Sequence, residues 1–139
     1  MSTPTQAPAA ADPYALPDGA WGRELTIDLA GCDPAMIRDQ TALAEWARHL
    51  VDEIGMTPYG QPIIQTFGDG ALYGHTVIQL ITTSSIMVHA VHETLTAYVN
   101  VFSCRDFDVA SAVNFTVRAF GARAHTLHDQ LRAAPPLDS

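Results

Sequence analysis

Apolar and polar residues alternate with two different periods along this chain, and these periods predict strands in some segments and helices in others. Residues 24–29 alternate at period two, as expected for a strand with one buried face, and Gly31 and Pro34 end this run. Further runs rich in β-branched and aromatic residues predict five more strands, over residues 62–67, 75–82, 86–92, 96–103 and 125–131.

Two other segments have the three-four apolar spacing of an amphipathic helix. The first begins after Asp39, a typical N-cap residue, and ends at Gly55, while the second begins after Asp108 and ends at Gly121. The order is therefore strand, helix, four strands, helix, strand. This order predicts an α/β two-layer sandwich, in which a mostly antiparallel sheet carries two helices on one face.

The length and the ends of the chain indicate a single domain. A chain of 139 residues has room for one two-layer core. We expect residues 1–20, which are rich in Pro and Ala, to form a disordered arm. Residues 21–132 would form the domain, and residues 133–139 a frayed tail.

The composition argues against several classes of partner and location. Seven basic residues against 15 acidic ones give a formal net charge of −8, which disfavours binding to nucleic acid. No apolar run approaches the roughly 20 residues that span a bilayer, and residues 1–19 lack the features of a signal peptide. Two cysteines, Cys32 and Cys104, are too few for a disulfide scaffold. We therefore expect a cytoplasmic protein with free thiols and no membrane partner.

The stretch from the third to the fifth predicted strand holds most of the candidate chemistry. Taken singly, the Ser84-Ser85 pair is typical of a turn, His89 of a core residue and Cys104 of a small buried side chain. A metal site is disfavoured because His89 and His92 are three residues apart, and odd spacing on a strand places them on opposite faces. A serine hydrolase is disfavoured because the chain has no Gly-x-Ser-x-Gly motif.

Taken together, these residues resemble the signature of the bacterial and archaeal S-adenosylmethionine decarboxylases. In that family a His follows a strand-end Ser by five residues, a Glu follows the His by four, and a Cys follows the Ser by twenty. Ser84, His89, Glu93 and Cys104 match all three intervals, and residues 101–104 resemble the family's Val-Phe-Thr-Cys. The resemblance extends over about residues 22–131.

The resemblance implies an enzyme that cleaves itself to make its own cofactor. Ser84 would attack the carbonyl of Thr83, assisted by the hydroxyl of Thr76, and His89 would remove the α-proton of Ser84. The chain would split into residues 1–83 and 84–139, leaving a pyruvoyl group derived from Ser84. The ketone of this group would form a Schiff base with the substrate's amine and accept the electron pair released with CO₂.

The same resemblance implies roles for residues in the later steps. Cys104 would return a proton to the carbanion, and Glu93 would bind the ribose hydroxyls of the substrate. Phe67 is a candidate for stacking on adenine, because Phe67-Gly-Asp-Gly70 occupies the segment where the family has its stacking aromatic. The product would be the aminopropyl donor for spermidine synthesis. The active unit would be a homodimer of cleaved protomers that uses no metal.

Departures from the family pattern leave alternatives open, and the most serious is that residues 67–70 lack the family's His-Arg pair and the stacking aromatic after it. Thr83 occupies a position that is usually Glu or Lys, Ser85 replaces a His, and Val77 replaces a Gly. One alternative is a pyruvoyl-dependent decarboxylase of another amino acid, such as ornithine or arginine. The other is an unprocessed homologue that binds or regulates a partner and catalyses nothing.

Overall fold

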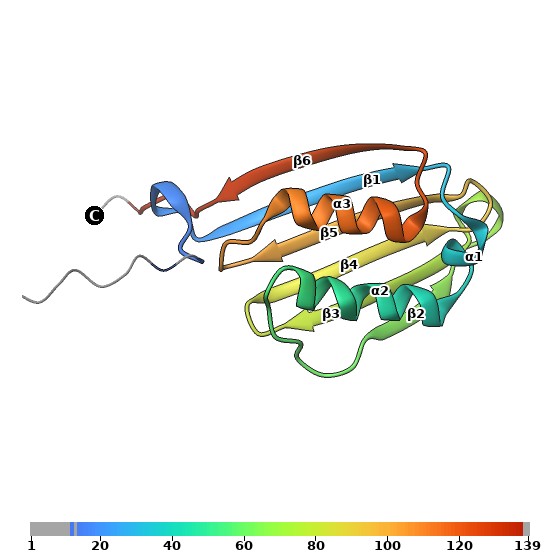
Figure 1. The fold of residues 1–139 in the computed structure, drawn as a ribbon, viewed down its shortest axis with the longest axis horizontal. Coiled ribbons are helices and arrows are strands. Elements are labelled where there is room, and N and C mark those ends of the chain that lie inside the picture. Colours follow the sequence, from blue (N-terminus) through green and yellow to red (C-terminus); the bar gives the residue numbers. More distant parts are fainter. Residues whose placement is uncertain (1–11, 13, 138–139) are drawn as a thin grey trace, which may run out of the picture.

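Six strands form one sheet in the computed structural model, which describes residues 12 and 14–137. The strands are β1 (Gly22–Ala30), β2 (Ile63–Phe67), β3 (Gly74–Ile81), β4 (Ser84–Val91), β5 (Thr96–Ser103) and β6 (Ala124–Arg132). Their order across the sheet is β2-β3-β4-β5-β1-β6, and every ladder between named strands is antiparallel (Figure 1). The predicted two-layer sandwich is confirmed.

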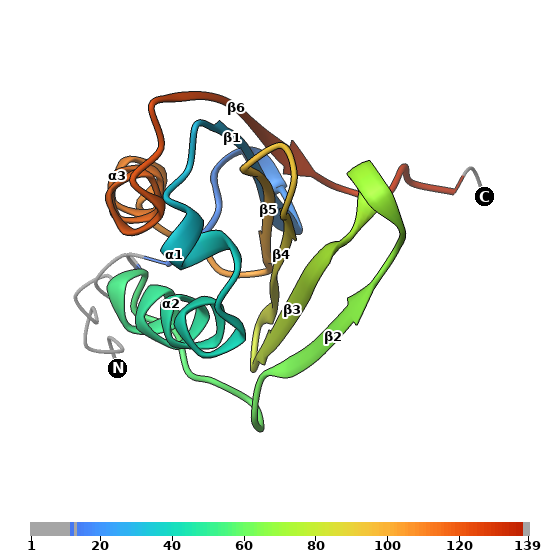
Figure 2. The ribbon, with the colours of Figure 1, turned by 90° about the vertical axis from the view of Figure 1, so that its right-hand side faces the viewer.

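Both predicted helices are present on one face of this sheet. They are α2 (Gln40–Glu53) and α3 (Val109–Phe120), and Figure 2 shows them on the same side of the strands. The Asp39 carboxylate accepts hydrogen bonds from two backbone amides at the start of α2, and that of Asp108 accepts one at the start of α3. These bonds satisfy amides that have no partner within the helix.

Three short helical segments of the described residues were not predicted, namely α1 (Pro34–Ile37) and the 3-10 turns η1 (Pro17–Gly19) and η2 (Gly70–Leu72). The Asp33 side chain caps α1 by accepting a hydrogen bond from the Ala35 amide at 2.9 Å. Proline fits the first helical position because the amide there has no intrahelical partner. Four residues are too few to show a helical period, so the pattern of apolar positions could not reveal α1.

The core lies between the helices and one face of the sheet. Alternate residues of β1, β4 and β5 point toward the helices and are almost completely buried. Between the two long helices, the rings of Trp46 and Phe120 pack edge to face with centroids 5.1 Å apart. Burying one large apolar side chain stabilises a fold by about 2 kcal/mol, so the buried residues of β1, β4 and β5 hold these strands against the helices.

The other face of the sheet carries no helix from the described part of the chain (Figure 2). Strand register places four exposed large apolar residues on this open face: Ile63, Phe67, Leu80 and Tyr98. No described helix is long and apolar enough to cross a membrane. Apolar side chains grouped on one face are typical of a surface that another protein or a ligand covers.

Part of the predicted N-terminal arm contacts the domain. The Tyr14 carbonyl accepts a hydrogen bond from the Asp106 amide at 2.7 Å, and the Arg105 guanidinium lies 4.2 Å from the centre of the Tyr14 ring. Residues 1–11 and 13 of the predicted arm, and 138–139 of the predicted tail, lie outside the described residues. The division into arm, domain and tail therefore stays a prediction.

Candidate active site

The hairpin between β3 and β4 carries the candidate cleavage site. Its two-residue turn consists of Thr82 and Thr83, while Ser84 and Ser85 already belong to β4. The turn predicted for the serine pair is therefore wrong by two residues. Ser84 pairs with Ile81 across one ladder and with a β5 residue across the next, and this pairing draws its backbone into the sheet.

A backbone hydrogen bond holds the carbonyl that Ser84 would attack. The Cys104 amide donates to the carbonyl oxygen of Thr83 at 3.0 Å. A donor at this distance polarises the carbonyl and stabilises negative charge that develops on its oxygen. The structure therefore brings together Thr83, Ser84 and the backbone of Cys104, three residues that the sequence analysis assigned to one site.

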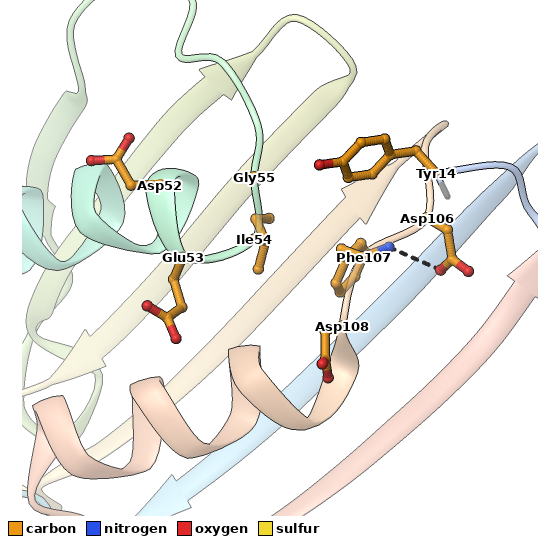
Figure 3. Close-up of a pocket in the computed structure, with 8 residues that line it drawn as sticks. All are labelled: Tyr14, Asp52, Glu53, Ile54, Gly55, Asp106, Phe107 and Asp108. Atoms are coloured by element: carbon orange, nitrogen blue, oxygen red, sulfur yellow. Dashed lines mark hydrogen bonds between the residues drawn. The ribbon is translucent and has the colours of Figure 1, made fainter. Parts of the chain in front are cut away.

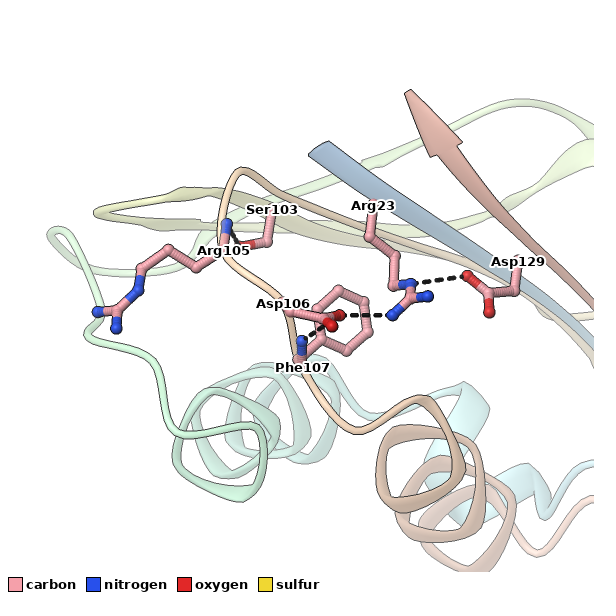
Figure 4. Close-up of polar contacts among 6 residues, drawn as sticks. All are labelled: Arg23, Ser103, Arg105, Asp106, Phe107 and Asp129. Carbon is pink, nitrogen blue, oxygen red and sulfur yellow. Dashed lines mark hydrogen bonds and ion pairs between the residues drawn. The ribbon is translucent and has the colours of Figure 1, made fainter. Parts of the chain in front are cut away.

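A buried hydroxyl supports the same peptide. Ser103, at the end of β5, is completely buried, and its Oγ donates to Thr83 Oγ1 at 3.1 Å. The same Oγ accepts a hydrogen bond from the Arg105 amide at 3.0 Å (Figure 4). The sequence analysis did not single out Ser103. The one signal for it was its place in the Val-Phe-Ser-Cys segment, where the family also has a hydroxyl.

The candidate imidazole and the candidate assisting hydroxyl form a second pair. Thr76 on β3 and His89 on β4 lie directly opposite each other in the ladder, and Thr76 Oγ1 is 2.8 Å from His89 Nδ1. Thr76 is 9% exposed, whereas His89 is exposed on the open face. The hydrogen bond orients the ring and leaves its Nε2 away from the threonine.

Ser84 and His89 do not meet within one chain. Five residues separate Ser84 from His89 along β4, a distance of about 16 Å at 3.3 Å per residue. The spacing is odd, so their side chains also point to opposite faces of the sheet. His89 shares the open face with Met87, whereas Ser84 shares the helix-covered face with the buried Ile86.

The two candidate substrate-binding residues lie at the His89 end of the sheet. Phe67 ends β2 and pairs with Gly74, which pairs in turn with Val91 near the end of β4. The Phe67 side chain is 58% exposed on the open face. Glu93 is exposed in the turn after β4. The His89 end, defined here by Thr76, His89, Phe67 and Glu93, is therefore separate from the Ser84 end, which contains Thr83, Ser84, Ser103 and Cys104.

A second pair of imidazoles lies behind the His89 end, on the helix-covered side. The His75 Nε2 donates to the Arg38 carbonyl at 3.2 Å, and the ring centroids of His75 and His92 are 4.4 Å apart. Burial lowers the pKa of His92, and the positive charges of His75 and Arg38 lower it further. His89 is not part of this cluster. Among the described residues, no three His, Cys, Asp or Glu side chains are grouped to hold a metal ion.

An acidic hollow of about 500 Å³ lies between the end of α2, the start of α3 and the N-terminal segment (Figure 3). Four carboxylates line it, but two of them already have structural roles. Asp108 caps α3, and Asp106 forms an ion pair with Arg23 and accepts a hydrogen bond from the Phe107 amide. Two of the four carboxylates in the hollow therefore stabilise the fold.

The Arg23 ion pairs fix the loop that carries Cys104. Arg23 lies at the start of β1, and its guanidinium contacts Asp106 in the loop after β5 (Figure 4). Its Nε lies 3.1 Å from a carboxylate oxygen of Asp129 on β6, close enough for an ion pair although the angle does not suit a hydrogen bond. These charges are only partly exposed, so solvent screens the contacts incompletely.

The two thiols differ in accessibility. Both are free, but Cys32 is buried in the core and Cys104 is partly exposed. Burial raises the pKa of the Cys32 thiol to about 11, so this group stays protonated at neutral pH. Of the two cysteines, Cys104 alone lies beside the candidate cleavage site.

The antiparallel two-layer sandwich thus carries Ser84 and Cys104 at one end of β4 and His89 toward the other end. A protein-family model described as S-adenosylmethionine decarboxylase matches residues 23–133. The chain therefore belongs to the S-adenosylmethionine decarboxylase family. Membership makes it a carboxy-lyase, as the sequence analysis predicted.

The comparison with solved structures agrees with this assignment at the level of the fold. The chain is similar to the adenosylmethionine decarboxylase of Aquifex aeolicus, with a TM-score of 0.70 and 20% sequence identity. The match covers 86% of this chain and 97% of the Aquifex chain. A search of the curated proteins finds no match.

Proposed function

We propose that the chain cleaves itself between Thr83 and Ser84 and then decarboxylates S-adenosylmethionine, giving the aminopropyl donor for spermidine synthesis. The observation that carries this proposal is the hydrogen bond from the Cys104 amide to the Thr83 carbonyl oxygen. It supports the carbonyl of one particular peptide bond, and the next residue is the serine that the family signature identifies. The two free thiols agree with a reaction in the cytoplasm.

The first step is a transfer of the acyl group within the chain. The Ser84 Oγ attacks the Thr83 carbonyl carbon, the C–N bond breaks, and the amide becomes an ester. Negative charge on the carbonyl oxygen is stabilised by the Cys104 amide during this step. An imidazole then removes the Ser84 α-proton, the Thr83 carboxylate leaves, and hydrolysis of the new N-terminus releases ammonia.

The residues at the Ser84 end fit the pyruvoyl group that this sequence of steps would leave. The new N-terminus would remain at the start of β4, between its neighbours on β3 and β5. When present, the group supplies an electron sink for the loss of CO₂. Cys104 is partly exposed beside this position and would supply the proton that replaces the carboxylate.

The active unit is proposed to be a homodimer in which a second copy supplies the imidazole. Within one chain about 16 Å along β4 separates His89 from Ser84, so His89 cannot remove the α-proton of its own chain. The open face bears His89 and four exposed large apolar residues, and a second copy would bury them. The dimer would place the His89 end of one copy against the Ser84 end of the other.

Co-expression of two inactive variants tests this arrangement. Ser84→Ala cannot be cleaved, and His89→Ala lacks the base. If His89 acts across the dimer, the His89→Ala chain will be cleaved when it is co-expressed with Ser84→Ala. If neither chain is cleaved although mixed dimers form, the histidine does not act in trans.

The side chains at the His89 end support an adenosyl substrate. Phe67 offers an exposed ring on the same face as His89, and Glu93 offers an exposed carboxylate beyond the end of the same strand. Stacking on an aromatic ring and hydrogen bonds to ribose hydroxyls require these two types of group. Release of CO₂ from S-adenosylmethionine but not from ornithine or arginine supports this choice. The reverse preference would establish the alternative substrate class.

An unprocessed homologue that binds or regulates a partner is the second candidate. One observation favours it, namely that in the described part of one chain His89 lies five residues along β4 from Ser84 and on the opposite face. Reaction with hydroxylamine separates the two candidates. A carbonyl that labels the wild-type protein and is missing from Ser84→Ala supports the decarboxylase, and a wild-type protein that never labels supports the binding protein.

A further inference from the structure

A chain of hydrogen bonds links the loop after β5 to the side chain of the cleavage-site threonine. The Arg105 amide donates to Ser103 Oγ at 3.0 Å, and Ser103 Oγ donates to Thr83 Oγ1 at 3.1 Å. Thr83 Oγ1 in turn donates to the sulfur of Met56 at 3.3 Å. Thr83 Oγ1 therefore accepts from Ser103 while it donates to Met56, whose sulfur also lies 4.0 Å from Ser103 Oγ.

These side-chain hydrogen bonds and a backbone hydrogen bond hold Thr83 from two sides. The Cys104 amide holds the carbonyl oxygen, and the completely buried Ser103 hydroxyl holds the side chain. A residue fixed at both its carbonyl and its hydroxyl cannot rotate its peptide plane freely. The other turn residue, Thr82, donates its backbone amide to the Thr57 carbonyl oxygen at 3.0 Å.

We propose that Ser103 is a positioning residue for self-cleavage, acting through the hydroxyl of Thr83. The inference rests on the proposed function, because it concerns the rate of the same cleavage. It also explains how the chain tolerates threonine at position 83. The Thr83 hydroxyl accepts a hydrogen bond from Ser103 Oγ, and this bond keeps the Thr83 carbonyl within hydrogen-bond distance of the Cys104 amide.

The test is a double-mutant cycle on the rate of cleavage. Mass spectrometry at successive times after expression measures this rate. Ser103→Ala and Thr83→Val each remove one end of the bond and should slow cleavage about tenfold. The double variant should be no slower than either single variant, because both remove the same interaction. Ser103→Thr keeps the hydroxyl and should cleave at close to the wild-type rate.

Thr116→Val is the matched control for loss of a buried hydroxyl. Thr116 is also completely buried, and its Oγ1 accepts a hydrogen bond from the Trp46 indole between the two helices. This variant should lower Tm without slowing cleavage more than about twofold. A Ser103→Ala variant that loses Tm to the same extent and also cleaves at the wild-type rate would overturn the inference and leave the proposed function intact.

Hydrogen exchange supplies a measurement that does not depend on cleavage. In the Ser84→Ala background, adding Ser103→Ala should speed exchange of the Cys104 amide about tenfold, because the Thr83 carbonyl becomes less firmly held. Unchanged exchange would show that Ser103 does not fix this peptide. Failure of the wild-type chain to cleave at all would instead reject both the proposed function and this role.

Discussion

The two ends of β4 are built in opposite ways, although they belong to the same strand. At the Ser84 end, the Cys104 amide and the buried Ser103 hydroxyl hold Thr83 in place. At the His89 end, an exposed imidazole rests on a single hydrogen bond to a threonine and faces outward from the sheet. The bond to be broken is thus held rigidly, while the group that moves protons is left accessible. This difference predicts that the two ends respond differently to substitution.

The largest effect is expected from His89→Ala. Loss of the proposed base should slow cleavage by at least about 100-fold, since positioned acid–base groups contribute about 10²–10⁴-fold. His89 is exposed, so the fold should remain stable. Mass spectrometry over time after synthesis measures the rate. His49→Ala, on the exposed side of α2, is the control and should cleave normally. Equal cleavage rates for the two variants would show that His89 is not the base.

Cys104→Ala should separate the backbone of this residue from its thiol. The variant keeps the amide that holds the Thr83 carbonyl, so the protein should still cleave. Turnover of S-adenosylmethionine per mole of cleaved chain should fall about 100-fold, because the proton donor is lost. Parallel measurements of carbonyl content and CO₂ release check this. A loss of cleavage as large as the loss of turnover would contradict the assignment of the two roles.

Thr76→Val should have a smaller effect at the His89 end. The substitution keeps the shape of the side chain but removes the hydroxyl that lies 2.8 Å from His89 Nδ1. With the ring less firmly oriented, cleavage should slow about tenfold. Thr76→Ser keeps the hydroxyl and should restore most of the rate. If valine and serine variants cleave equally fast, the hydroxyl does not orient the imidazole.

The smallest effect concerns stability and comes from the imidazole behind the His89 end. The pKa of His92 lies below its ordinary value of 6.5 in the folded protein, so around and below this pH the unfolded chain binds more protons. The free energy of unfolding should therefore fall as the pH drops from about 7 through the folded pKa. Thermal unfolding of wild type and His92→Asn measures this. The variant should show a shallower decline of Tm, and identical slopes would exclude His92 as the cause.

Much of the fold could be predicted from the sequence. All six strands and both long helices follow from alternation, β-branched runs and Asp caps, because these patterns extend over several residues. The α1 turn was missed because its four residues show no period. The Ser84-Ser85 pair was placed in a turn because serine is common there, whereas cross-strand pairing takes both serines into β4. The start of β4 is therefore set by pairing with the neighbouring strands and not by the turn propensity of serine.

The site was less predictable than the fold. Family spacing grouped Ser84, His89 and Cys104, but the odd interval between Ser84 and His89 already placed them on opposite faces of a strand. The same rule separated His89 from His92 in the sequence analysis. The partners of Thr83 could not be predicted, because both lie far from it in the sequence. Ser103 meets Thr83 only when β4 and β5 pair, and Met56 only when the segment after α2 packs against the turn between β3 and β4.

The most direct test is the intact mass of the freshly purified wild-type protein. Self-cleavage predicts two polypeptides, residues 1–83 and a second fragment that spans 84–139 and begins with a ketone in place of the serine amine. Incubation should convert remaining precursor into these two products, while Ser84→Ala stays whole. A wild-type chain that keeps all 139 residues at every time point would contradict the account.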